Sequence, residues 1–181
     1  PDWLDLQVQA NALLRDSSAG HFMERLDKLQ SRLRRHSRLN PDGTLFALIH
    51  LSATEVRMYS ATHAMLVSVM CGLAAREVLK WPEEQEVRLC KAALTMNLGM
   101  TGLQDQLTRQ VEAPSPAQRK AIDEHANKSA DMLADMGVVD ADWLEAVRNH
   151  HTQVPGRLQS RTVPQQIARM IQRADMFAAR L

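Results

Sequence analysis

The sequence predicts an all-α fold, and three observations support this prediction. The 181 residues include only 4% aromatic residues, while Leu, Ala, Met and Arg, which favour helices, are plentiful. Apolar residues recur at intervals of three and four, and no stretch shows the alternation of a half-buried strand. Hydrophobic residues make up 45% and charged residues 24%, as in soluble globular proteins. The length fits one domain, or one domain with a helical appendage.

Two amphipathic helices are expected at the N-terminus, over about residues 3–14 and 22–33, where Leu, Val and Met recur with helical spacing. The segment Asn40-Pro41-Asp42-Gly43 is typical of a turn. These helices contain no recognisable chemistry. We therefore expect residues 1–52 to form an N-terminal helical extension that faces a partner, with a homodimer through these helices as one arrangement. Residues 53–181 are expected to form the main domain.

A long helical pattern follows from Thr44 to Lys80, with a break expected near residues 52–54. The next helix is expected to start at Trp81-Pro82, because proline suits a first turn and the acids that follow suit the positive end of the helix dipole. It is expected to end near Gly99. The inner face of the long pattern is expected to contain Val56, Tyr59, His63, Val67, Met70, Ala74 and Val78.

The remaining helices are indicated by their caps. Ser115-Pro116 is a typical helix N-terminus, and Gly137 suits the C-terminus of the same helix. Asp140 is expected to cap the next helix, after which Pro155-Gly156 forms a turn. A last helix is expected from about Pro164.

Charge and cysteine content argue against several classes of protein. The formal net charge is +1, so no global attraction to nucleic acid or to an anionic membrane is expected. No apolar run predicts a membrane span, and no signal peptide opens the chain. Cys71 and Cys90 lie inside apolar helical patterns and form no metal or redox motif, which indicates a reducing, cytoplasmic setting. Because the chain starts without Met and stops within a helical pattern, we expect a longer protein that is truncated here.

Polar residues interrupt the apolar stripes at a few positions. Each one alone has an ordinary explanation as a helix cap, a solvated residue or a satisfied core residue. Together they would cost on the order of several kcal/mol to bury without partners. Imidazole and carboxylate groups bind Fe, Mn or Zn, and helical bundles build such sites from facing helices. We therefore expect a common pocket, able to hold at most one divalent metal, formed by His63, His125, His150, His151 and Asp175, with Asn97 nearby.

The order of these residues matches a known set of motifs over about Tyr59 to Leu181. An early helix carries a His at residues 59–63, a capped helix carries a His at 122–126, a tandem His stands at 150–152, and an Ala-Asp-x-Phe motif stands at 174–179. This order resembles the HD-GYP family of the HD phosphohydrolase superfamily. The resemblance implies an HD-type helical bundle and a bacterial signalling domain, related to enzymes that hydrolyse cyclic di-GMP.

The match to the family fails at its signature motif. Met96-Asn97 stands in place of the family's His-Asp pair, and Met100 in place of its Lys. The Asp of that pair normally bridges two metals, and a neutral Asn amide cannot supply the bridging anion. The Gly-Tyr-Pro loop is absent, and Ala178 replaces the second Asp of the last motif. The resemblance with these losses implies one metal or none, and impaired catalysis at the degenerate pair.

Three functions remain open at this point. The first is a degenerate HD-GYP-like domain that binds a nucleotide, such as cyclic di-GMP, or a signalling protein without hydrolysis. The second is an active metal-dependent phosphohydrolase with an altered set of ligands. The third is a purely structural helical interaction domain. Arg157 and Arg161 follow the tandem His and are candidate phosphate contacts, with solvated loop residues as the alternative interpretation.

Overall fold

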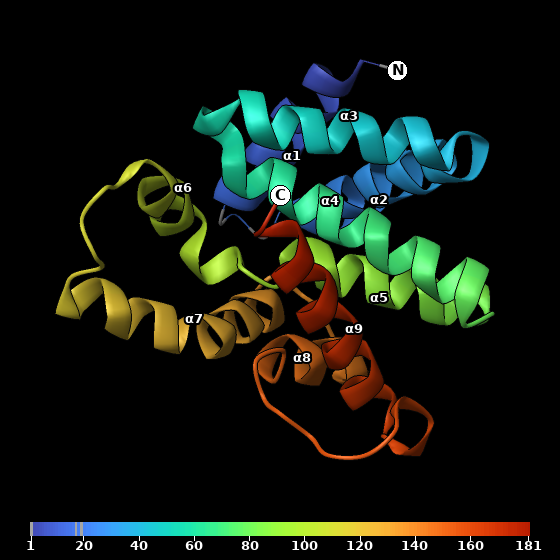
Figure 1. Ribbon diagram of the computed structural model, residues 1–181. Coiled ribbons are helices and arrows are strands. Elements are labelled where there is room, and N and C mark those ends of the chain that lie inside the picture. Colours follow the sequence, from blue (N-terminus) through green and yellow to red (C-terminus); the bar gives the residue numbers. More distant parts are fainter. Residues whose placement is uncertain (1, 17, 19) are drawn as a thin grey trace.

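The computed structural model describes residues 2–16, 18 and 20–181, and within these ranges it is helical without any strand. The predicted all-α class is therefore confirmed. Figure 1 shows the N-terminal helices on one side and α7 to α9 on the other, with α4 and α5 between them. The elements are α1 (Trp3–Arg15), α2 (Phe22–Leu39), α3 (Pro41–Thr54), η1 (Val56–Met58), α4 (Tyr59–Leu73), η2 (Ala74–Val78), α5 (Glu83–Thr95), η3 (Leu98–Met100), α6 (Thr101–Arg109), α7 (Pro116–Asp135), α8 (Ala141–Arg148), η4 (Leu158–Ser160) and α9 (Val163–Ala178).

The connection between α2 and α3 is shorter than the sequence predicts. The turn expected over residues 40–43 consists of Asn40 alone, because α3 already begins at Pro41. The Asn40 side chain accepts a hydrogen bond from the backbone N–H of Gly43, and Pro41 occupies the first turn, where its missing N–H costs nothing. The same residues that are typical of a turn thus act here as a helix start.

Helix α4 runs through the centre of the molecule, where residues 60–69 are buried on every side. It packs against helices α1, α2, α3, α5, α6 and α9. The single inner face predicted from Val56 to Val78 is wrong at both ends, because Val56 is 37% and Val78 is 75% exposed. The helical stretch is interrupted at Glu55. The π-helical turn η2 contains one residue more than an α-helical turn, and this shift in register turns Val78 toward solvent.

The stretch Val56–Val78 is long and apolar enough to cross a membrane by length and composition. This finding contradicts the expectation that no apolar run reaches that length. In the structure, 72% of the most apolar 18-residue window of this stretch is buried among the other helices. The core helix of a globular protein has the same composition, because a helix that is apolar on all sides must be covered on all sides.

Helix α5 ends at Thr95, four residues before the predicted end, and the sequence analysis did not predict α6 at all. The sequence of α6 gives little signal, since its buried residues are Thr101 and Asp105 rather than apolar side chains. Asp105 accepts a hydrogen bond from the backbone N–H of Ser60 at 2.7 Å and pairs with Arg15. Helix α6 is therefore fixed to α1 and α4 by polar contacts that a hydrophobic period cannot reveal.

The caps predicted for the C-terminal helices are present. Ser115 and Gln118 form a reciprocal capping box at the start of α7, and Asp140 accepts from the N–H of Trp143 at the start of α8. Gly137 ends α7 with a φ of +99°, a conformation that favours glycine. The last helix begins one residue before Pro164, with Thr162 as a second capping box that the sequence analysis missed.

Removing the cap of α7 gives a simple test of this local structure. We expect Ser115→Ala to lower the free energy of unfolding by about 1 kcal/mol, because the N–H of Gln118 loses its acceptor. Chemical denaturation would measure the change. Ser31→Ala on α2 is the matched control, since Ser31 is exposed inside a helix and its replacement should cost nothing. Equal midpoints for both variants would contradict the role of the cap.

Candidate metal site

The candidate site is formed where α7 meets the end of α8. His125 lies in the third turn of α7, and His150 and His151 directly follow α8. The chain positions them through the caps at Ser115 and Asp140, which fix where each helix begins. Helices α7 and α8 pack against each other. The two imidazoles at the end of α8 therefore meet the one on α7.

The three imidazoles point the same ring nitrogen at one another. The Nε2 atom of His125 lies 3.3 Å from Nε2 of His150 and 3.3 Å from Nε2 of His151. The three ligand atoms all lie within 4.8 Å of one another. Two nitrogens bound to a tetrahedral zinc at about 2.0–2.1 Å lie about 3.3–3.4 Å apart. The spacing of the His125 Nε2 atom from each of the other two is therefore that of nitrogens sharing one ion.

The other ring nitrogens determine which tautomer is present. Nδ1 of His125 is hydrogen-bonded to the carbonyl of Ile122, and Nδ1 of His150 lies 2.6 Å from the carbonyl of Val147. A carbonyl can only accept, so both Nδ1 atoms carry the proton and a neutral ring presents a bare Nε2. Two such lone pairs facing each other at 3.3 Å repel unless a proton or a cation lies between them. Outer hydrogen bonds of this kind orient metal-binding histidines in proteins.

Burial keeps the tandem histidines neutral. His150 is fully buried and His125 is 4% exposed, while His151 is exposed. Burial, together with the neighbouring imidazoles of His151 and His125, lowers the pKa of His150 to about 3, against the opposing effects of the Val147 carbonyl and of Asp175. Although the residue as a whole is exposed, partial desolvation of the His151 ring and the neighbouring His125 lower the pKa of His151, against the opposing effect of Asp175. Neutral imidazole is the form that binds a metal, so the site needs no deprotonation of these rings at pH 7.

His63 and Asp175 form a separate pair next to the three histidines. Nε2 of His63 on α4 lies 2.6 Å from Oδ1 of Asp175 on α9, and the Tyr59 hydroxyl lies 3.4 Å from Nδ1 of His63. Burial raises the pKa of the Asp175 carboxyl, but the hydrogen bond and charge of His63 outweigh burial and hold that pKa below its usual value. The carboxylate is therefore ionised. Its charge also acts on His150 and His151.

The structure thus divides the five predicted ligands into a group of three and a pair. Among the described residues, the group with mutually close ligand atoms is His125, His150 and His151 and contains no carboxylate. Met96 is 1% exposed and belongs to the hydrophobic core, whereas Asn97 is half-buried at the start of η3. The three histidines could be predicted as ligands from residue type and from the order of the motifs. These signals could not reveal the carbonyls of Ile122 and Val147, each three residues before a histidine, which fix the tautomers.

The two predicted phosphate contacts lie in different surroundings. Arg157 is exposed at the start of η4. Arg161 is half-buried, and its Nη2 donates to the carbonyls of Val154 and Gly156. The guanidinium of Arg161 is thus engaged by the loop backbone, whereas Arg157 faces solvent.

Comparisons with protein-family models, with curated proteins and with solved structures found no match to this chain. The likeness to the HD-GYP family therefore depends on the motifs alone. The geometry of the histidines is independent of that likeness.

Proposed function

We propose that this chain is a degenerate HD-type signalling domain that holds one divalent metal on His125, His150 and His151 and works by binding rather than by hydrolysis. The convergence of three Nε2 atoms, two of them forced to be bare acceptors, carries the proposal. Three imidazoles without a carboxylate suit Zn or Fe better than Mn, which prefers oxygen ligands. When bound, the ion would supply a Lewis acid at the end of α8.

Hydrolysis of a phosphodiester by two metals requires anionic ligands that the two ions share. The structure supports an impaired centre, because Asp175 is already engaged by His63 and lies outside the group of three. Asn97 offers a neutral amide where the family carries its bridging carboxylate. A single ion on three imidazoles then remains as a structural or ligand-binding element, and the partner is a nucleotide or a signalling protein.

A metal-dependent hydrolase is the second candidate, and one observation favours it. Catalytic zinc sites keep three protein ligands and an open fourth position. The three-histidine site also has a side that faces solvent, because His151 is exposed. The His63–Asp175 pair could then hold or move a proton beside the site.

Product analysis distinguishes the two candidates. We expect protein loaded with Zn, Fe or Mn to release no linear dinucleotide from cyclic di-GMP, because the three-histidine group contains no anionic ligand that two ions could share. Chromatography of overnight reactions would detect turnover, and elemental analysis should find no more than one ion per chain. Linear product that appears with wild-type protein and vanishes with His150→Ala would support the hydrolase and overturn the proposed function.

A further inference from the structure

A cavity of about 190 Å³ lies between α8, the loop after it and the start of α9. Asn149 and Thr152, which flank the tandem histidines, line it together with Arg161 and Arg169. None of the three histidines is part of its lining. The cavity is therefore a separate place for a ligand, reached from the same segment of chain as the candidate metal site.

Arg161 is held rigidly in this cavity. Its Nη2 atom donates to two loop carbonyls, those of Val154 and Gly156, the latter at 3.0 Å. Its Nε atom is buried and has no hydrogen-bond partner among the described residues. A guanidinium that backbone carbonyls orient loses little rotamer freedom when it binds an anion. Its Nε and Nη1 atoms have no hydrogen-bond partner among the described residues, so the guanidinium keeps donors that an anion could use.

Arg169 brings a second positive charge from α9. Its Nη1 atom donates to Oε1 of the buried Gln172 at 2.7 Å, which fixes the direction of the side chain. Burial, then the positive charges of Arg173 and Arg161, lowers the pKa of Arg169. Like charges held close to one another repel, and a bound anion would offset that repulsion.

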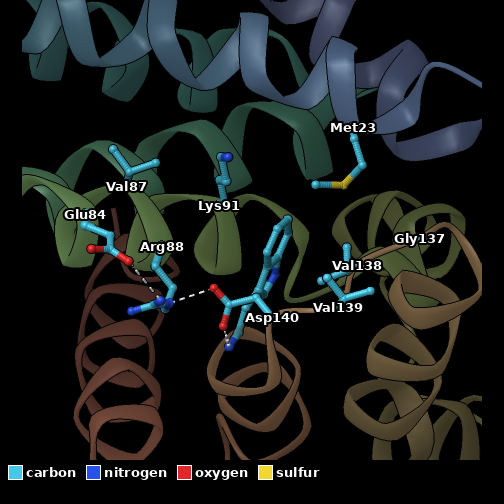
Figure 2. A pocket seen from close by; sticks show the side chains of 10 residues that line it. Met23, Glu84, Val87, Arg88, Lys91, Gly137, Val138, Val139 and Asp140 are labelled. Atoms are coloured by element: carbon cyan, nitrogen blue, oxygen red, sulfur yellow. Dashed lines mark hydrogen bonds and ion pairs between the residues drawn. The ribbon is translucent and has the colours of Figure 1, made fainter.

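The cavity in Figure 2 gives a comparison, because its cations are paired with carboxylates. That cavity, of about 270 Å³, also contains two cations, Arg88 and Lys91. Arg88 lies between Asp140, at 2.7 Å, and Glu84, at 3.5 Å (Figure 2). Lys91 lies 2.6 Å from Asp27. In contrast, the hydrogen-bond acceptors of Arg161 and Arg169 in the described chain are carbonyl and amide oxygens.

We propose that the cavity between α8 and α9 binds the phosphoryl group of a small ligand through Arg161 and Arg169. Arginine forks bind phosphate oxygens through charge-assisted hydrogen bonds, and two forks from different elements can reach different edges of a tetrahedral anion. The start of α9 adds the positive end of a helix dipole, since Pro164 and Gln165 also line the cavity. The inference goes beyond the proposed metal site and does not depend on it.

The size of the cavity limits the ligand. Sites for drug-sized molecules usually measure about 300–1,000 Å³. A volume of about 190 Å³ accommodates a phosphate and its first attached atoms, but not a whole cyclic dinucleotide. The exposed carboxylate of Glu145 at the edge of the cavity disfavours a second anionic group there. The ligand class is therefore a small phosphomonoester.

Calorimetry on chelator-treated protein at low ionic strength tests the proposal with inorganic phosphate as the probe. We expect measurable binding of phosphate, weakened about tenfold or more by Arg169→Ala and by Arg161→Ala. Arg157→Ala is the matched control, because this arginine belongs to the same loop but does not line the cavity. Glu145→Gln should leave phosphate binding unchanged or strengthen it. Circular dichroism melts would verify that each variant is folded.

Four results would overturn the proposal: no phosphate binding by folded wild-type protein, equal weakening by Arg157→Ala, acetate binding as tight as phosphate, or loss of phosphate binding in His151→Ala. Failure here can be told from failure of the proposed function by elemental analysis. Arg169→Ala should keep the metal content of the wild type, whereas His151→Ala should lose metal and keep phosphate binding.

Discussion

The variant His150→Ala is expected to lose bound divalent metal, with an affinity for Zn lowered more than 100-fold. Mutating even an outer hydrogen-bond partner of a metal ligand typically costs about 10–100-fold in affinity, and His150 would be a direct ligand. Its Nε2 atom lies 3.3 Å from that of His125 and is held bare by the bond from Nδ1 to the Val147 carbonyl. Competition with a fluorescent zinc chelator would measure the affinity.

His150 is fully buried, so its removal also leaves a cavity. His151→Ala removes a ligand from the exposed side of the same site and should fold normally, so it gives a second measure of the same loss. His50→Ala on α3 is the matched control, since this exposed imidazole contacts only the ring of Phe46 among the aromatic residues described. Wild-type zinc affinity in both His150→Ala and His151→Ala would exclude the three-histidine site.

The parts of this fold that depend on neighbours in sequence could be predicted, and the parts that depend on distant contacts could not. Ser115 and Asp140 act within three residues of themselves, so their caps follow from residue type. Helix α6 was missed because Asp105, its main anchor, contacts α1 and α4 from far along the chain. Val78 was placed inward because a π-helical turn leaves no mark on the hydrophobic period.

The candidate site shows the same division. The three histidines could be proposed from their order, because motif order reflects which helices face each other. Their separation from His63 and Asp175 could not be proposed, since the 2.6 Å contact between α4 and α9 joins residues 112 positions apart. Residue type also does not reveal that Nη2 of Arg161 donates to loop carbonyls whereas Arg157 is exposed to solvent. Both outcomes depend on backbone positions that only the packed helices define.

Glu86→Ala is expected to lower the free energy of unfolding by about 3–5 kcal/mol. The Glu86 side chain is 2% exposed and lies 2.7 Å from Nη1 of Arg76 and 3.3 Å from Nε of Arg34. These contacts join α5 to α2 and to η2, and Arg76 also donates to the carbonyl of Ser37. Alanine would leave two largely buried guanidinium groups without their buried carboxylate. Arg34 would keep only the exposed Glu83, and Arg76 only the exposed Glu77. Removing one partner of a buried ion pair costs far more than the pair contributes to stability, because the remaining charge stays desolvated.

Urea denaturation of wild-type and variant protein would measure this change. Glu84→Ala is the matched control, two residues earlier on the same helix, with an 85% exposed side chain 3.5 Å from Arg88. An exposed pair of this kind contributes about 0–1 kcal/mol. Glu86→Gln should fall between the two variants, because it keeps an acceptor oxygen but loses the charge. If Glu86→Ala and Glu84→Ala unfolded at the same urea concentration, the ion pairs of Glu86 would be part of a surface network that water screens. The junction between α2 and α5 would then depend on apolar packing alone.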